Sequence, residues 1–260
     1  MTDKGVYSPT RILQGALNSS FQWQANISKL FRDMIDANFL HIFIDDLLGH
    51  GTTEDNMLDN LERVLKRAVE TNLKFNVNKI QLSMHETRWC GKIYSSTGVK
   101  HDPSRVEALT KMAEPTTADQ LSTFIHAVGW MRSSIPDFPH LMRPLQHVMD
   151  AVNARLKGLP NKQRLLSSIH LHDEGLWTNE SSAGLAAVKE TLKNMVELAY
   201  PKSTHVTCLL PDASDYAWGS IVTQILKEDL DLPIAEQRHE PLAFFGRRFT
   251  GSERRWSTYH

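Results

Sequence analysis

The sequence contains little cysteine: Cys90 and Cys208 are the two in 260 residues. They lie far apart and lack the spacing of metal ligands, and a secreted domain held by disulfides needs more of them. This scarcity favours a reducing, intracellular setting. It does not distinguish the cytoplasm from the nucleus.

Long hydrophobic runs are also lacking. No apolar stretch approaches the roughly 18–20 residues that cross a bilayer as a helix. Residues 1–9 are polar and lack the apolar region of a signal peptide. We therefore expect neither a membrane span nor a secretory signal.

An excess of one charge is the third absence, since 29 basic residues face 30 acidic ones and the net charge is -1. A strongly basic balance, frequent in nucleic-acid-binding proteins, is therefore missing. One local exception lies near the C-terminus and forms either a basic edge or an ordinary solvated face. It consists of Arg247, Arg248, Arg254 and Arg255 against Glu253.

What is present is an ordinary globular composition, 41% hydrophobic and 23% charged. The length exceeds the roughly 100–200 residues of one domain, so two or more modules are expected. The patterns of the first hundred residues predict mixed α and β structure. They indicate a helix over 22–37, a strand over 39–44 that leads into a hairpin with Asp45 and Asp46 at its tip, and a helix capped by Thr52 or Thr53. On that helix Leu58, Leu61, Val64, Leu65 and Ala68 are expected to be buried.

A second hairpin is expected over 88–100, with its turn near 95–98. After residue 101 the pattern becomes helical and is punctuated by prolines, so we place a domain boundary there. Helices are expected to begin at Pro103, to run over 117–131, and to extend towards Val152. Residues 154–180 resemble a connecting segment, followed by a helix at about 181–197 and strands over 205–210, 218–225 and 242–245.

Asp45 and Asp46 are the sharpest chemical feature. Nucleotidyl transfer uses two divalent metals about 3.5–4 Å apart, and carboxylates must converge on them from a rigid support such as a hairpin tip. The alternative is structural, because aspartate is a common turn former.

The surrounding motifs favour the catalytic interpretation. The run Phe43-Ile44-Asp45-Asp46 resembles the Tyr/Phe-x-Asp-Asp motif of gypsy-type long-terminal-repeat retrotransposon reverse transcriptases. Further segments resemble other motifs of that family. Leu13-Gln14-Gly15 with Asn18–Phe21 resembles the nucleotide pocket, Leu73–Lys79 the Leu-Lys-x-Asn-x-x-Lys stretch, and Trp89-Cys90-Gly91 the primer grip. Ile135–Phe138 with Pro144-Leu145 resembles the thumb, and Asp212–Asp215 with Trp218–Ser220 resembles the opening of the ribonuclease H domain.

The resemblance implies an α+β fold in four parts. Residues 1–101 would be a partial polymerase palm with the primer-grip hairpin, an antiparallel sheet plus helices. Residues 102–153 would be a helical thumb and residues 154–203 a connection. Residues 204–260 would be the first part of a ribonuclease H-like α/β domain.

The resemblance also implies roles for single residues. Asp45 and Asp46 would be catalytic metal ligands of the polymerase, with Asp45 the more direct one, and Asp212 the first metal ligand of the ribonuclease H. The nucleotide would be contacted by Gln14, Gly15 and Lys79. Lys79 would donate a proton to pyrophosphate or be a structural lysine. The primer grip would be formed by Trp89, Cys90 and Gly91.

The implied cofactor is Mg²⁺ or Mn²⁺ in two-metal sites, and the implied partners are an RNA template, a DNA primer, their hybrid and dNTPs. The rest of a Pol polyprotein, with protease and integrase, is expected as well. The family's first palm aspartate and later ribonuclease H carboxylates have no counterpart here, since only Asp3 precedes Arg11 and the sequence ends at His260. We therefore expect both metal sites to be complete only in a longer protein. A non-catalytic hybrid-binding remnant and a functionless degraded copy remain alternatives.

Overall fold

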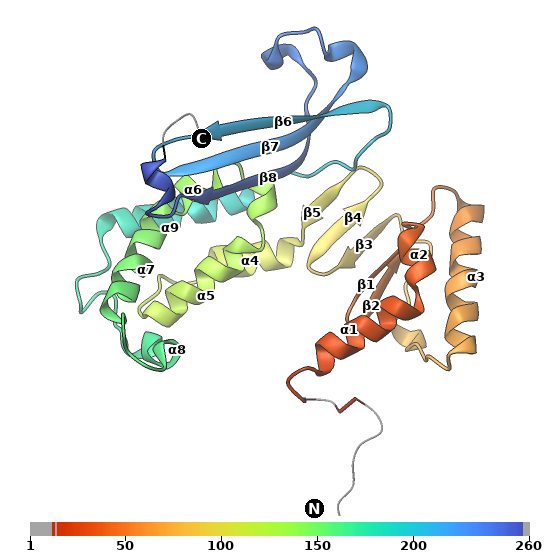
Figure 1. Cartoon of the computed structure of the whole chain (residues 1–260), viewed down its shortest axis with the longest axis horizontal. Helices are drawn as coiled ribbons and strands as arrows, with labels where there is room; N and C mark the ends of the chain where they lie inside the picture. Colours follow the sequence, from red (N-terminus) through yellow and green to blue (C-terminus); the bar gives the residue numbers. More distant parts are fainter. Residues whose placement is uncertain (1–11, 14, 257–260) are drawn as a thin grey trace, which may run out of the picture. The chain divides into compact units, whose positions relative to one another are not determined.

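The computed structural model describes residues 12, 13 and 15–256. The chain divides into two compact units, one ending at Cys90 and the other beginning at Gly91. Helices and antiparallel strands occur in both, which confirms the predicted α+β class (Figure 1). The predicted four-part division remains a prediction.

The first unit is built around a short hairpin. Its helices are α1 (Ser19–Leu30), α2 (Arg32–Asp36), α3 (Glu54–Glu70) and the 3-10 turn η1 (Val77–Lys79), and its strands are β1 (Leu40–Phe43), β2 (Asp46–Gly49) and β3 (Glu86–Trp89). The single helix expected over 22–37 is divided at Phe31. The apolar side chains still converge, and the buried core consists of Ile27, Phe31, Met34, Phe39 and Leu40.

Helix α3 follows the predicted cap, because the Thr53 side chain accepts a hydrogen bond from the backbone N–H of Asn56. Its buried face is narrower than expected. Ala68 is buried, but Leu58 is 53% exposed and Leu65 43% exposed, so those two assignments were wrong. Periodicity identifies the apolar stripe of a helix, and only tertiary packing decides how much of that stripe is covered.

The second unit opens with the predicted hairpin, β4 (Lys92–Ser95) and β5 (Val99–His101), whose turn is closed by a bond from the N–H of Ser95 to the carbonyl of Gly98. The helices that follow are α4 (Pro103–Lys111), α5 (Ala118–Gly129), η2 (Arg132–Ser134), α6 (Phe138–Leu141), α7 (Arg143–Arg155), α8 (Lys162–Leu165), η3 (Leu166–Ser168) and α9 (Asn179–Lys193). Three of them, α4, α5 and α9, begin at side-chain caps from Asp102, Thr117 and Thr178.

One apolar core joins α4, α5, α7, η3 and α9. The segment 154–180 is less irregular than a simple connection, because it forms α8 and η3 and buries Leu166, Ile169 and Leu171 in that core. Its sequence lacks periodicity because its elements are short. The positions of its apolar residues are set by contacts with several helices, so they follow no single helical period.

The unit ends in an antiparallel sheet of β6 (His205–Ala213), β7 (Ala217–Leu226) and β8 (Glu240–Arg248), in that order. The 3-10 turns η4 (Lys227–Asp229) and η5 (Ile234–Glu236) lie between β7 and β8, and η6 (Glu253–Arg255) follows β8. Helix α6 packs against β7 and β8 (Figure 1). All three predicted strands are present and are longer than expected.

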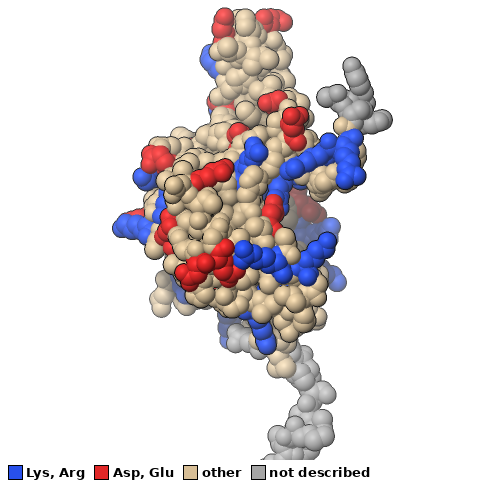
Figure 2. Space-filling model, turned by 90° about the vertical axis from the view of Figure 1, so that its left-hand side faces the viewer, with Lys and Arg blue, Asp and Glu red and all other residues tan. Residues whose placement is uncertain are grey.

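Charge is mixed over the surface. Figure 2 shows Lys and Arg side chains interspersed with Asp and Glu on the face that it draws, rather than one continuous basic area. Among the residues described, no helix combines the length and the apolar character needed to cross a membrane.

Candidate active site

The predicted hairpin with acids at its tip is confirmed. Strands β1 and β2 pair antiparallel with Phe43 opposite Asp46, which leaves Ile44 and Asp45 as a two-residue turn. Asp45 therefore lies in the turn and Asp46 opens β2. Both side chains are exposed, so their carboxylates are accessible from solvent.

The turn has an unusual backbone at Ile44, whose φ is +55°. Hairpin turns with a positive φ at the first central residue favour glycine there, and a β-branched residue at positive φ is a rare, strained case. Such strain costs about 1–3 kcal/mol and persists only where the surroundings fix it. Something must therefore hold this turn.

Two side chains of α1 hold it by hydrogen bonds to the Ile44 backbone. The Trp23 indole Nε1 donates to the Ile44 carbonyl at 2.9 Å, and the Ile44 N–H donates to Gln24 Oε1 at 2.5 Å. The Gln24 amide nitrogen also donates to the Ile42 carbonyl at 3.3 Å and to Ser28 Oγ at 2.9 Å. Both backbone polar groups of the strained residue are thus satisfied, and the Asp-Asp tip is fixed to α1.

Sequence analysis missed Trp23 and Gln24. One signal was available, because Gln24 precedes Ile27 by three residues and Phe31 by seven and so lies on the apolar stripe of α1. A polar residue on a buried stripe usually has a hydrogen-bond partner. The pattern does not reveal which backbone group that partner is.

His41 of β1 connects the hairpin with the predicted primer-grip residue Trp89. Its ring stacks on His50 with centroids 5.5 Å apart, and the Trp89 ring lies 6.4 Å away. Burial, and secondly the neighbouring His50, lower the pKa of His41 below its usual value. A neutral imidazole therefore packs in the aromatic contact between β1 and β3.

The other two predicted primer-grip residues have a special backbone, with φ of +50° at Cys90 and +76° at Gly91. Cys90 is exposed and Gly91 half-buried. A Cβ at Gly91 would overlap the Arg105 guanidinium. Position 91 therefore favours glycine for its backbone conformation, while the flexible Arg105 side chain can shift to make room for a Cβ.

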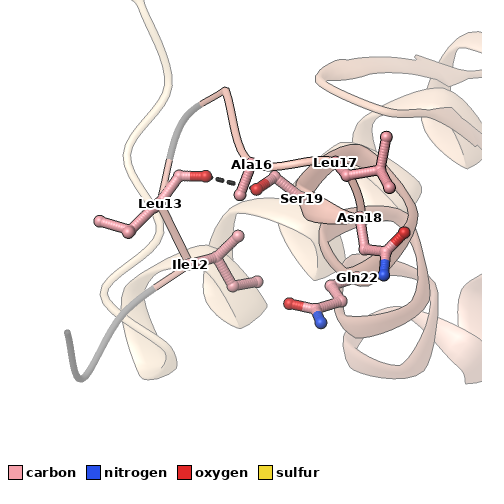
Figure 3. Close-up of a pocket in the computed structure, with 7 residues that line it drawn as sticks. All are labelled: Ile12, Leu13, Ala16, Leu17, Asn18, Ser19 and Gln22. Atoms are coloured by element: carbon pink, nitrogen blue, oxygen red, sulfur yellow. Dashed lines mark hydrogen bonds between the residues drawn. The ribbon is translucent and has the colours of Figure 1, made fainter. Parts of the chain in front are cut away.

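The predicted nucleotide segment is described in part, since Gln14 lies outside the described residues. Gly15 has φ of +83° and open space where a Cβ would be. The adjoining residues surround a shallow open hollow of about 340 Å³, lined by Ile12, Leu13, Ala16, Leu17, Asn18, Ser19 and Gln22 (Figure 3). Lys79 is exposed at the end of η1.

Asp212 lies in β6, opposite Gly219 of β7, and is exposed. Its Oδ1 accepts the N–H of Ala213 at 2.8 Å. The preceding Pro211 is tolerated because β6 is an edge strand of its sheet.

The comparisons with known proteins agree with these motifs. Residues 1–94 match the family model "Reverse transcriptase (RNA-dependent DNA polymerase)", and residues 177–260 match "RNase H-like domain found in reverse transcriptase". The Pol polyprotein of the Drosophila melanogaster transposon opus is 26% identical over 99% of this chain, and that of transposon 412 is also 26% identical over 99%. These two segments carry a reverse transcriptase domain and an RNase H-like domain, and the relatives that the chain resembles are retrotransposon Pol polyproteins.

The chain spans 24% of the opus polyprotein and 18% of the 412 polyprotein. Solved structures share the fold of this chain. A foamy viral protease-reverse transcriptase in complex with RNA/DNA hybrid matches 96% of this chain and 30% of its own, with a TM-score of 0.70 and 19% identity. The same viral protein in complex with dsDNA matches with a TM-score of 0.69 and 19% identity.

The acids at the tip of the hairpin fit part of a divalent-metal site. Carboxylate oxygens are the ligands that Mg²⁺ prefers, and Asp45 and Asp46 offer them side by side on a fixed turn. Within residues 12–13 and 15–256, no group of three or more His, Cys, Asp or Glu side chains is arranged to hold a metal ion. The chemistry of the pair fits the metal, while the described part does not make up a complete ligand set.

Proposed function

We propose that this chain is the palm, thumb, connection and ribonuclease H portion of an intracellular RNA-directed DNA polymerase. It would engage an RNA template, a DNA primer and a dNTP, together with the remainder of a Pol polyprotein. The observation that supports this most is the Asp45–Asp46 hairpin tip fixed by Trp23 and Gln24, within the segment that matches the reverse transcriptase model.

Each residue would have a distinct task. Asp45, and beside it Asp46, would hold Mg²⁺ or Mn²⁺, which when bound supplies charge stabilisation for nucleotidyl transfer. Trp23 and Gln24 would keep the two carboxylates in place through the Ile44 backbone. Trp89, Cys90 and Gly91 would position the primer end, and Gln14, Gly15 and Lys79 would contact the nucleotide.

Asp212 would be one ligand of a second metal site, for hydrolysis of the RNA strand. Its exposed position on an edge strand leaves it accessible to a hybrid duplex. A two-metal site needs several convergent carboxylates. The motifs assign two carboxylates, Asp45 and Asp46, to the polymerase site and one, Asp212, to the ribonuclease H site.

The function is tested by incubating the chain with a primed RNA template, nucleotides and Mg²⁺ or Mn²⁺, and by titrating it with a labelled RNA–DNA hybrid. We expect the hybrid to bind with an affinity that falls as salt rises, and we expect no primer extension by this chain alone. Asp45→Asn and the matched control Asp59→Asn, an exposed aspartate of α3, are measured in parallel.

The outcomes separate the competing hypotheses. Template-dependent extension that Asp45→Asn abolishes and Asp59→Asn preserves would show that the chain already contains a complete polymerase site. Hybrid binding without extension agrees with the proposed portion of a polymerase. No complex at low ionic strength would contradict the proposal and favour a functionless copy.

A further inference from the structure

Tyr216 is the centre of a cationic cluster in the second unit. It lies between β6 and β7 and is 8% exposed. The Arg143 guanidinium carbon lies 4.8 Å from the centre of its ring and that of Arg254 lies 5.4 Å away. The rings of His140 and His147 lie 5.7 and 6.2 Å from the same ring.

The carboxylates of this cluster are mostly engaged by other cations. Arg248 binds both oxygens of Asp150, the longer contact being 2.8 Å. Arg247 binds both oxygens of Glu253, at 2.8 and 2.6 Å, and this pairing lowers the pKa of Glu253 to about 2.

On the other side of the cluster, Asp137 contacts His140 Nδ1 at 2.6 Å. Within the described part of the chain, neither Arg143 nor Arg254 forms an ion pair, and Asp215, beside Tyr216, pairs with neither.

The arginines near the C-terminus, for which a basic edge and a solvated face were both open, therefore differ in their partners. Arg247 and Arg248 are neutralised by acids, while Arg254 is joined by Arg143 from the start of α7. Both of these arginines are exposed. A guanidinium stacked on an aromatic ring is partly ordered and still presents its edge donors, which match the oxygens of a phosphate.

We propose that Arg143 and Arg254, ordered on Tyr216, form a contact site for the phosphate backbone of the bound nucleic acid. This inference rests on the proposed function and extends it to two arginines that lie far apart in the sequence and meet on one ring. A backbone fits better than a small free anion, because the guanidiniums are exposed side chains that stack on a buried ring. Two stacked guanidiniums can each take an oxygen pair from a phosphate of an extended strand.

The experiment measures anisotropy of a labelled RNA–DNA hybrid with the full chain from about 50 to 300 mM salt. Each neutralised phosphate contact contributes about 0.9 to the slope of log K against log salt. Arg143→Gln and Arg254→Gln should each lower that slope by about 0.9, and the double variant by about twice that. The affinity should fall several-fold for each change.

Arg155→Gln is the matched control, because Arg155 lies on the same helix as Arg143 and is already bound to Glu174. It should leave the slope unchanged. Inorganic tripolyphosphate, titrated by calorimetry into the original chain and the four variants, serves as an independent probe of the pair. Circular dichroism verifies that each variant is folded.

The possible failures are distinguishable. If the chain binds the hybrid and the double variant keeps the original slope, the arginine site is contradicted and the proposed function stands. If the chain binds no hybrid, the proposed function fails, and with it the assignment of this site to nucleic acid. Tripolyphosphate binding that still depends on both arginines would then identify a site for small anions instead.

Discussion

The two units hold their candidate aspartates in different ways. The first has a small buried core, and its Asp45–Asp46 tip is fixed by side-chain hydrogen bonds from Trp23 and Gln24. The second has a much larger apolar core, and Asp212 lies on a strand paired continuously with its neighbour from His205 to Ala213. A small core stabilises little by burial alone, so the polar contacts of the first unit are expected to matter more.

The largest expected effect is that of Phe31→Ala. Phe31 is fully buried in the core of the first unit, and a buried Phe→Ala change costs about 3–5 kcal/mol. Hydrogen exchange should become fast in β1 and β2 while β6–β8 remain protected. Phe21→Ala, in the adjoining helix α1 but 77% exposed, should change little. Equal loss of protection in both units would refute the contrast between their cores.

A smaller effect is expected in the second unit on acidification. Burial, followed by the charges of Lys92 and Arg105, lowers the pKa of His101 to about 4. The folded state keeps His101 neutral where the unfolded chain, with a pKa of about 6.5, takes up a proton. Stability is therefore full above pH 6.5 and falls as pH decreases towards 4, by up to about 3 kcal/mol.

His101→Gln should remove this part of the pH dependence. Urea unfolding at pH 7 and pH 5, followed through a probe in the second unit, measures it. His170→Gln changes an exposed histidine of the same unit, and its free energy of unfolding should differ between pH 7 and pH 5 as much as that of the original protein. If His101→Gln loses as much stability between pH 7 and pH 5 as the original protein, another group causes the pH dependence.

The smallest effect is that of Gln24→Ala. The change leaves the Ile44 N–H without its acceptor, which costs about 1–3 kcal/mol if water does not replace it. The amide resonances of Ile44 and Asp45 should shift or broaden, and the first unit should melt at a lower temperature. Gln22→Ala replaces an exposed glutamine of the same helix and should leave these resonances in place.

Local signals predicted much of the fold. Helix starts at Thr53, Asp102 and Thr117 follow from caps whose bonds span two or three residues. The two hairpins follow from short apolar runs around polar turns. The family motifs identified the Asp-Asp tip for the same reason, because its residues are adjacent in sequence.

What the sequence did not predict depends on distant contacts. The bonds from Trp23 and Gln24 to Ile44 join residues 20 and 21 positions apart, and the Arg143–Tyr216–Arg254 stack joins three separate segments. The break at Phe31 and the exposure of Leu65 likewise depend on what packs against each helix. Periodicity contains no information about such partners.

We propose that Asp45 and Asp46 bind a divalent metal at a tip that α1 fixes. Titration of the ¹⁵N-labelled chain with paramagnetic Mn²⁺ tests it most directly, with the Asp45→Asn/Asp46→Asn double variant beside it. The account predicts that Mn²⁺ broadens the amide signals of residues 42–47 first and that the double variant loses this broadening. Broadening that begins elsewhere, or that persists unchanged in the double variant, would contradict it.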